Sequence, residues 1–465
     1  MGENRHEFDA VVVGAGTSGA TCAIKLAEKG LGVALLDARS LEDAGYHHIN
    51  NIPPEMFDAA GIPRPSGAED IGGAGEPVKF LTCSERVQVL VGPNPVRGVN
   101  MHLLTRRLHR MALDAGVAPY ERSTIAEVEF RGARPTGIII ESRLANGQTR
   151  RIHLAAKLFI DASGMGGALR SHIPALAKYC RPLEAHDICT AAQQTCAIDK
   201  PHAALQYLDR IDCRPGEYIN QLGYAGGFST MTIKVEKDLK SAELLTGVID
   251  DGRHGTGLEQ LEKFKRREGF TGKVLIQDGG RIPLRRPYDV FVAEGIACVG
   301  DAACQVFPAH ASGTGMGIVA AKMLASAVAD CADPGDMQCL WRYQADFMRT
   351  HGAVHASYDL FRRVSQAMSE AGVEKLLSSQ LMTGHSLMAG LRQQMPELHS
   401  GDMLAAVGGA VQAPLIAARA IPAIMKMGPV YALYRLYPQK ADTWKLKQWS
   451  RAVARIFGDK PDFTG

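Results

Sequence analysis

The chain has 465 residues, of which 46% are hydrophobic, so it is too long for one compact core and two or three domains are expected. It carries 52 Lys and Arg against 49 Asp and Glu, and the resulting formal net charge of +3 argues against a nucleic acid as the main partner. Ten cysteines occur without a CxxC pair, which favours reduced thiols in the cytoplasm over disulfides, and no metal site is expected.

A glycine-rich turn near the start of the chain predicts a dinucleotide site. The sequence AVVVGAGTSGA (10–20) places three glycines between an apolar strand and a helix. In this context the glycines allow a tight turn, the close approach of a pyrophosphate and helix packing, and Asp37 after the next strand can bind a ribose. The residues assigned to this site are Gly14, Gly16, Thr17, Ser18, Gly19, Asp37, Ala38 and Arg39.

Further along the chain we expect a second acid-ended strand and a separate sheet. KLFIDASGMGGALR (157–170) ends a strand at Asp161, residues 186–290 are rich in strand patterns, and the pattern of the first domain resumes near residue 295. The predicted fold class is α/β. It comprises a discontinuous Rossmann-like domain (1–75, 97–185 and 291–335), a β-sheet substrate-binding domain (76–96 and 186–290) and a helical C-terminal region (336–465).

An apolar strand is expected to end at Asp301 in the stretch GIACVGDAACQVFPAHASGTGMG (295–317). Burying a carboxylate there is costly unless a ligand binds to it. A strand ending in Gly-Asp and followed by a glycine-rich helix start is similar to the second fingerprint of FAD enzymes of the p-hydroxybenzoate hydroxylase and geranylgeranyl reductase superfamily. The resemblance implies an FAD-binding Rossmann-like domain, with Asp301 on the ribityl chain and the helix from Gly313 directed at the flavin. It also assigns to the cofactor Asp161, Gly164, Gly300, Pro308, Thr314, Gly315 and Met316.

The expected substrate domain decides which branch of the superfamily the chain resembles. GYAGGFS (223–229) is similar to the YxWxFP pattern of geranylgeranyl reductases, and the match implies that Tyr224 and Phe228 bind substrate. Gly226 replaces the tryptophan and Ser229 the proline, which should reshape the pocket. Flavin-dependent halogenases are related to this family, but their WxWxIP pattern is missing from the sequence, so halogenation is not expected.

Three histidines are candidates for proton transfer. His47 and His48 follow Asp37 in a polar loop, and His310 follows Pro308 in the segment expected beside the flavin. Each also has a purely structural interpretation, as a loop residue or a helix-entry residue bonded to backbone. Because the flavin carries most of this chemistry, none receives a firm catalytic role.

The C-terminal region is first apolar and then basic. Pro414 and Pro422 interrupt the apolar segment 403–425, so a membrane-spanning helix is not expected. Residues 426–465 hold eight Lys or Arg against three Asp, a net +5. Two interpretations stay open, an anchor on an anionic membrane surface and a helix packed over the substrate domain.

Together these patterns predict an FAD-dependent oxidoreductase that reduces carbon–carbon double bonds of a hydrophobic, isoprenoid-like substrate. The alternative is a monooxygenase that hydroxylates an aromatic or polyketide substrate with NAD(P)H and O2. A second alternative is a non-catalytic, membrane-associated flavin electron relay. The sequence does not determine the electron donor or the oligomeric state, and NAD(P)H would have to bind without a Rossmann domain of its own.

Overall fold

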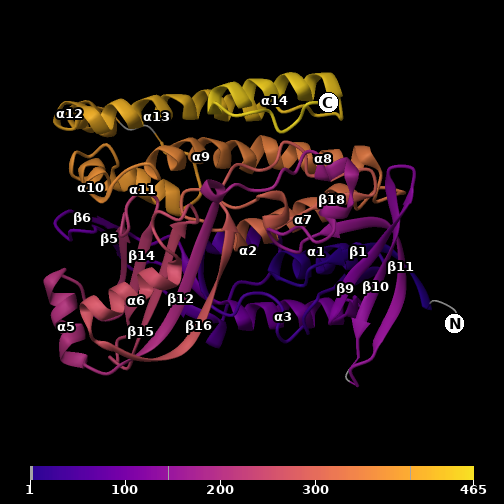
Figure 1. The fold of residues 1–465 in the computed structure, drawn as a ribbon, viewed down its shortest axis with the longest axis horizontal. Coiled ribbons are helices and arrows are strands. Elements are labelled where there is room, and N and C mark those ends of the chain that lie inside the picture. Colours follow the sequence, from indigo (N-terminus) through magenta and orange to yellow (C-terminus); the bar gives the residue numbers. More distant parts are fainter. Residues whose placement is uncertain (1–3, 145, 398–399) are drawn as a thin grey trace.

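The computed structural model describes residues 4–144, 146–397 and 400–465. Two large sheets lie side by side beneath layers of C-terminal helices (Figure 1). The architecture is the expected α/β fold, with a Rossmann-like part, a β-sheet part and a helical C-terminal region.

The first sheet is built around parallel strands with the apolar β1 at its centre. Its main path, in spatial order, is β17 (Val292–Ala293), β18 (Ile296–Cys298), β11 (Thr149–Asp161), β1 (Asn4–Val13), β2 (Val33–Leu36) and β8 (Ala118–Tyr120). β1 pairs in parallel with β2 and β11, and β11 in parallel with β18. The run Ala10–Val13 is buried, as expected for a strand at the centre of a parallel sheet. The carboxyl ends of β1, β11 and β18 therefore meet at one edge.

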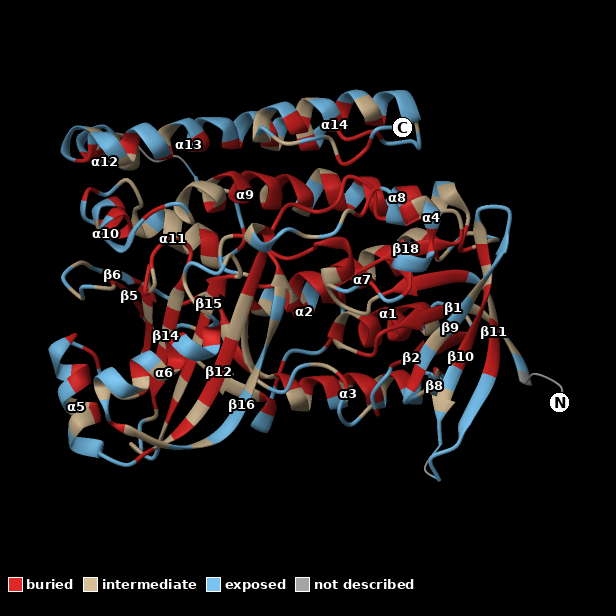
Figure 2. Ribbon diagram, viewed as in Figure 1, coloured by how far each residue is buried: buried red, intermediate tan, exposed pale blue. Residues whose placement is uncertain are grey.

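Strand β11 also extends the sheet in an antiparallel direction. Its first half pairs with β10 (Arg134–Arg143), which pairs in turn with β9 (Ser123–Arg131). Three helices pack on the sheet, and the first contacts both others; they are α1 (Thr17–Ala27), α3 (Met101–Asp114) and α7 (Thr314–Val328). Figure 2 shows the core of this part as a continuous buried layer.

The second sheet is largely antiparallel. Its order is β16 (Thr271–Pro283), β12 (Ile188–Ile198), β15 (Ser241–Ile249), β14 (Thr230–Val235), β13 (Tyr218–Leu222), β5 (Val78–Thr82) and β6 (Gln88–Val91). Strands from 76–96 thus join strands from 186–290, as in the domain division that we propose. Helix α6 (Gly257–Glu268) packs on this sheet and contacts α5 (Pro201–Arg210).

A small third sheet leads from the first sheet to the second. It consists of β3 (Ile49–Ile52), β7 (Arg97–Asn100) and β4 (Asp70–Gly72). Helix α2 (Pro54–Ala60) follows β3 and contacts α7. The short helix α4 (Pro174–Ala177) lies near β17.

The C-terminal helices form two layers above the sheets (Figure 1). The inner layer holds α8 (Met337–Phe347), α9 (Ala353–Ser365), α10 (Glu370–Ser378) and α11 (Gly384–Leu391), and a π-helical turn (Met348–Gly352) joins α8 to α9. The outer layer holds α12 (Ser400–Gln412), α13 (Pro414–Arg435) and α14 (Thr443–Phe457), and α13 packs on α9. No helix within the described ranges is long and apolar enough to cross a membrane.

A buried ion cluster ties the C-terminal end of the chain to the segment between β16 and β17. Arg285 and Arg286 pair with Asp462 and Asp289, and all four side chains are almost fully buried. Burial acts to raise the pKa of Asp462, but the two arginines outweigh it and hold that pKa below its usual range. Ser450 of α14 donates a hydrogen bond to Asp289, so α14 is fixed to the same cluster.

One expectation about the cysteines is wrong. Cys331, just after α7, and Cys339 in α8 form a disulfide, whereas the spacing of the cysteines favoured reduced thiols over disulfides. The remaining eight are free thiols. The cytoplasmic location inferred from the cysteines stays a prediction.

Candidate functional site

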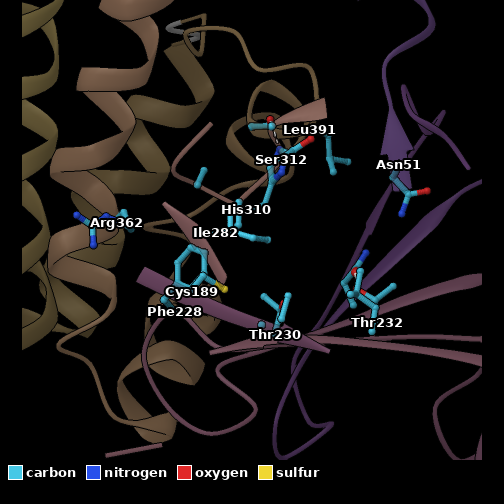
Figure 3. A pocket seen from close by; sticks show the side chains of 18 of the residues that line it. Asn51, Cys189, Phe228, Thr230, Thr232, Ile282, His310, Ser312, Arg362 and Leu391 are labelled. Carbon is cyan, nitrogen blue, oxygen red and sulfur yellow. Dashed lines mark hydrogen bonds between the residues drawn. The ribbon is translucent and has the colours of Figure 1, made fainter. Parts of the chain in front are cut away.

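A single cavity of about 810 Å³ runs between the two large sheets and on beneath the C-terminal helices. One end, the cofactor crevice, is formed by the turn from Gly14 to Ser18, by Asp301 and by the start of α7. The other end, the apolar arm, passes between the second sheet and α9 to α13. Its apolar lining includes Phe228, Ile282, Tyr358, Phe361, Leu376, Leu381, Leu387, Leu391, Ile424 and Met427. Figure 3 shows side chains from the second and third sheets, from the segment before α7 and from the C-terminal helices around this space.

The three glycines of the first turn have different roles. Gly14 has φ +103, and a Cβ there would lie 2.4 Å from the carbonyl oxygen of Ala162; a Cβ on Gly19 would lie 1.8 Å from that of Gly14. These two are required by close backbone packing. A Cβ on Gly16 would meet no atom within 4 Å. Gly16 is therefore not explained by packing, and the space beside it is what the approach of a pyrophosphate needs.

Two helix N-termini face the cofactor crevice without side-chain caps. Helix α1 begins after Gly16 and α7 after Gly313, and neither N-cap residue makes a side-chain hydrogen bond. The backbone N–H groups of a first helical turn lack partners within the helix and carry its positive dipole end. Both ends can therefore receive electron-rich groups of one extended ligand.

Asp37 closes the crevice at the end of β2. Its carboxylate accepts hydrogen bonds from the backbone N–H groups of Ala15, at 2.8 Å, and Arg39, at 2.9 Å. These bonds fix the carboxylate against the glycine turn. Asp37 still lines the cavity, where a ribose hydroxyl could reach it.

Asp301 is the carboxylate that most clearly lacks a partner. Within the described residues, no group donates a hydrogen bond to it, although it lines the cavity next to Gly313. Its side chain is half-buried at the cavity wall, and desolvation by the surrounding protein raises its pKa to about 6. A half-buried carboxylate without donors fits a ligand rich in hydroxyl groups, as expected for a ribityl chain.

The structure brings together most of the residues assigned from the sequence. The cavity is lined by Gly14, Gly16, Thr17, Ser18, Asp37, Arg39, His48, Gly164, Phe228, Asp301, His310, Gly313 and Thr314. Thr314 accepts a hydrogen bond from the amide of Asn50 at 2.9 Å, which joins β3 to the start of α7. The described cavity lining does not include Gly19, Ala38, His47, Asp161, Tyr224, Gly300, Pro308, Gly315 or Met316.

Two of the assigned residues that do not line the cavity have clear structural roles. Asp161 is fully buried and accepts hydrogen bonds from the backbone N–H groups of Ser163, Leu169 and Arg170, so its carboxylate holds the turn after β11. Tyr224 is buried in the core of the second sheet, with its ring 6.3 Å from that of Phe264. The carboxylate of Asp161 and the ring of Tyr224 are therefore used by the fold.

Two assigned glycines that do not line the cavity allow secondary-structure elements to pack closely, and His47 contacts another histidine. A Cβ on Gly300 would lie 2.8 Å from the hydroxyl of Ser18, so this glycine lets β18 meet α1. A Cβ on Gly315 would lie 2.3 Å from the sulfur of Met56, so this one lets α2 meet α7. The centre of the His47 ring lies 4.5 Å from that of His102, with the rings tilted by 58°, and His47 does not line the cavity.

A histidine–aspartate pair at the cavity joins the first domain to the second sheet. Nδ1 of His48 lies 3.1 Å from Oδ2 of Asp278, and the backbone N–H of His47 donates to the same oxygen at 2.9 Å. Burial acts to raise the pKa of Asp278, but the bonds from His48, His47 and Gly279 outweigh it, and the pKa lies below its usual range. Asp278 is thus a carboxylate near neutral pH and fixes the ring of His48.

Sequence reasoning missed Asp278 and also Tyr46. Both line the cavity, and the negative charge of Asp301, followed by burial, raises the pKa of the Tyr46 hydroxyl. Asp278 lies 230 residues from His48 in the chain. The acid in QDGG on β16 was a visible signal, although nothing local indicated its partner.

His310 also lines the cavity but has a different environment. Its Nε2 lies 3.1 Å from the carbonyl oxygen of Gly390, and desolvation by the surrounding protein lowers its pKa, although the ring is exposed to the cavity. Near neutral pH the ring is therefore uncharged and can donate to that carbonyl. This arrangement fixes the segment before α7 against the end of α11.

The sheet order, the glycine turn and the unpartnered Asp301 fit a crevice for an extended dinucleotide, and together with the following comparisons they support the class of FAD-dependent oxidoreductases. No protein-family model matches the chain. The chain is 22% identical over 460 residues to a digeranylgeranylglycerophospholipid reductase of Sulfolobus acidocaldarius, and the match covers 97% of each chain. The predicted resemblance to the geranylgeranyl reductase family is thereby confirmed.

Solved structures show the same fold. A geranylgeranyl bacteriochlorophyll reductase-like protein of Thermoplasma acidophilum aligns with a TM-score of 0.70 at 17% identity, over 92% of this chain and 100% of that one. A flavin-dependent brominase aligns with a TM-score of 0.60 at 15% identity, over 89% of this chain and 99% of that one. The relation to halogenases expected from the sequence thus extends to the fold.

Proposed function

We propose that the protein uses FAD to reduce carbon–carbon double bonds in the isoprenoid chains of a lipid. The observation that carries the proposal is the continuity of the cavity, since the cofactor crevice and the apolar arm form one space. An apolar chain lying in the arm would present a double bond at the crevice. The similarity to a reductase named for such a lipid supports the same substrate class.

The residues present fit the cofactor. The open space at Gly16 and the start of α1 would hold the pyrophosphate, Asp37 the ribose, and Asp301 with the start of α7 the ribityl chain and the flavin. Bound there, FAD supplies a hydride to the substrate once it has been reduced. The protein's own task is to align the double bond and to exclude water from it.

We assign the proton that completes the reduction to His48. Asp278 accepts from Nδ1 and fixes the ring, and no described residue bonds Nε2, so this atom can carry a proton into the cavity. His310 is the weaker candidate because its Nε2 is bonded to the carbonyl oxygen of Gly390. We therefore give His310 a positioning role.

Anaerobic turnover tests the proposed reaction. Protein reduced by dithionite, without oxygen, is mixed with detergent-dispersed geranylgeranylated lipid, and mass spectrometry measures the hydrogen gained by the lipid. We expect two hydrogen atoms per reduced double bond. Product that forms only with oxygen and contains an added oxygen atom would favour a monooxygenase. Flavin reoxidised by other electron acceptors, with the lipid unchanged, would favour an electron relay.

We also propose NAD(P)H as the electron donor and a location at a membrane surface. The donor would have to enter through the cavity, since only the first sheet presents a dinucleotide turn in the described chain. Anaerobic bleaching of the yellow flavin band by NADH or NADPH checks the donor. If neither bleaches it while a reduced ferredoxin does, the donor is a protein.

A further inference from the structure

The outer helical layer exposes an unusual number of large apolar side chains. Six of them lie along α12, α13 and the residue after α13, each between 67% and 82% exposed. A monomeric soluble protein rarely exposes a contiguous apolar patch of this kind without a partner for it. We call it the α12–α13 apolar face; it consists of Leu404, Val407, Val411, Leu415, Met425 and Leu436.

The exposed residues of this face are spaced at the period of an α-helix. Exposed positions recur every three or four residues from Leu404 through Leu415 to Leu436, and the positions between the large residues of α13 carry small or cyclic side chains. The opposite side of α13 is buried against α9. Figure 2 shows the exposed stripe along α12 and α13 at the outer surface. One side of the layer is therefore core and the other is an unpartnered apolar surface.

The charge of the same segment indicates the kind of partner. Residues 403–441 contain no Asp or Glu, while Arg419, Lys426, Arg435 and Lys440 are all exposed. Arg419 and Lys440 make no ion pair in the part of the chain that the structure describes. An apolar stripe flanked by free cations matches a bilayer with anionic headgroups, which binds both kinds of group.

The cavity approaches this face from within. Ala406 of α12 and Ile424 and Met427 of α13 line the apolar arm, and Ile424 is also 40% exposed at the surface. The same two helices thus form the outer surface and the end wall of the arm. A lipid chain leaving a bilayer at this face would therefore meet the two helices that wall the arm.

We infer that the α12–α13 apolar face docks on an anionic bilayer and places the end of the apolar arm at the lipid surface. The docking assigns a specific face to the membrane location proposed above, and the entry route also rests on the proposed reaction. The inserted leucine and valine side chains supply binding, and the flanking cations select anionic lipid. Binding therefore weakens as salt screens the charges.

Vesicle flotation tests the docking with the full-length flavoprotein. The vesicles contain phosphatidylcholine alone or with phosphatidylglycerol, at low and at high salt. We expect binding to the anionic vesicles at low salt, and about tenfold weaker binding for the double variant Val411→Glu/Leu415→Glu. The matched control is Leu275→Glu on β16, a residue 53% exposed in a strand that Figure 1 shows beneath the helical layers. Equal binding of wild type and double variant would overturn the inference.

A second measurement separates docking from self-association and from the reaction. If light scattering shows a wild-type dimer that becomes monomeric in the double variant, and vesicles bind neither, the face joins two copies and the inference is wrong. If docking holds, the double variant loses turnover on vesicle lipid and keeps it on detergent-dispersed lipid. Vesicle binding without any turnover would refute the proposed reaction and leave the docking intact.

Discussion

Replacing Asp301 by asparagine should stabilise the flavin-free protein and weaken its hold on the cofactor. The carboxylate lies in the cofactor crevice without a donor, and burial raises its pKa from 3.8 to about 6. The folded state therefore holds its proton more tightly than the unfolded chain does. Consequently the free energy of unfolding falls as pH rises between these two values, and the loss persists above pH 6.

The size of the effect follows from the same numbers. Each pKa unit corresponds to about 1.4 kcal/mol, so the full penalty on the ionised carboxylate is roughly 3 kcal/mol. Water entering the cavity lowers this, and we expect Asp301→Asn to raise the free energy of unfolding of the apoprotein by about 1–2 kcal/mol at pH 8. Near pH 4, where the folded protein carries the neutral acid, the two proteins should be nearly equal. Urea titrations of flavin-free protein at both pH values measure this.

Flavin binding should change in the opposite direction. A hydrogen bond to a charged group contributes about 1.5–3 kcal/mol, so Asp301→Asn should raise the Kd for FAD roughly 10- to 100-fold. The control is Asp330→Asn, at an exposed carboxylate after α7. A variant that keeps wild-type flavin content, or whose apoprotein gains no stability at pH 8, would refute this explanation of Asp301.

Three further substitutions test other parts of the site and the fold. Gly16→Ala should leave the apoprotein at least as stable, because its Cβ meets no atom, but should lower flavin occupancy at least tenfold, as measured by absorbance. Asp462→Ala leaves Arg285 buried without its carboxylate and should cost about 3–5 kcal/mol in urea unfolding. Asp278→Asn should reduce turnover roughly 10- to 100-fold with unchanged flavin content, because the ring of His48 loses the carboxylate that fixes it; stopped-flow kinetics measures this.

Each of these has a matched control. Gly408→Ala likewise meets no atom within 4 Å and should leave flavin content unchanged. Lys460→Ala removes an exposed charge two residues from Asp462 and should alter stability by less than about 0.5 kcal/mol. His47→Asn changes a ring outside the cavity and should preserve turnover. Wild-type behaviour of the three test variants would contradict the roles assigned to Gly16, Asp462 and Asp278.

The sequence predicted those parts of the site that depend on local chain geometry. Gly14, Gly16 and Asp301 each occur at a strand-to-helix turn, where a few consecutive residues determine the backbone and the dipole. The fold class was accessible for the same reason, since the apolar runs and the glycine turns repeat in chain order. The division into two sheets followed from the change of pattern after residue 186.

What the sequence could not provide depends on contacts between distant segments. The bond between His48 and Asp278 exists only because β16 crosses the end of the first domain, and no local pattern indicates that crossing. The cofactor role of Asp161 stays a prediction, because an acid that ends a strand can bind either a ligand or its own following turn, and here its carboxylate bonds that turn. The spacing of Cys331 and Cys339 matches no diagnostic pattern, although the start of α8 brings them together.

The wall of the apolar arm at Arg362 has a consequence for selectivity. This arginine lines the cavity, yet its guanidinium is bonded to Asp359 at 2.8 Å and to Asp187 at 3.1 Å, and Asp359 also accepts from the backbone of Arg286. A substrate carboxylate or phosphate beside Arg362 would face a guanidinium whose charge is already neutralised and whose position is fixed. For the proposed lipid substrate, the arm at Arg362 would therefore select by shape and not by charge, and a polar head group would have to be recognised elsewhere in the cavity.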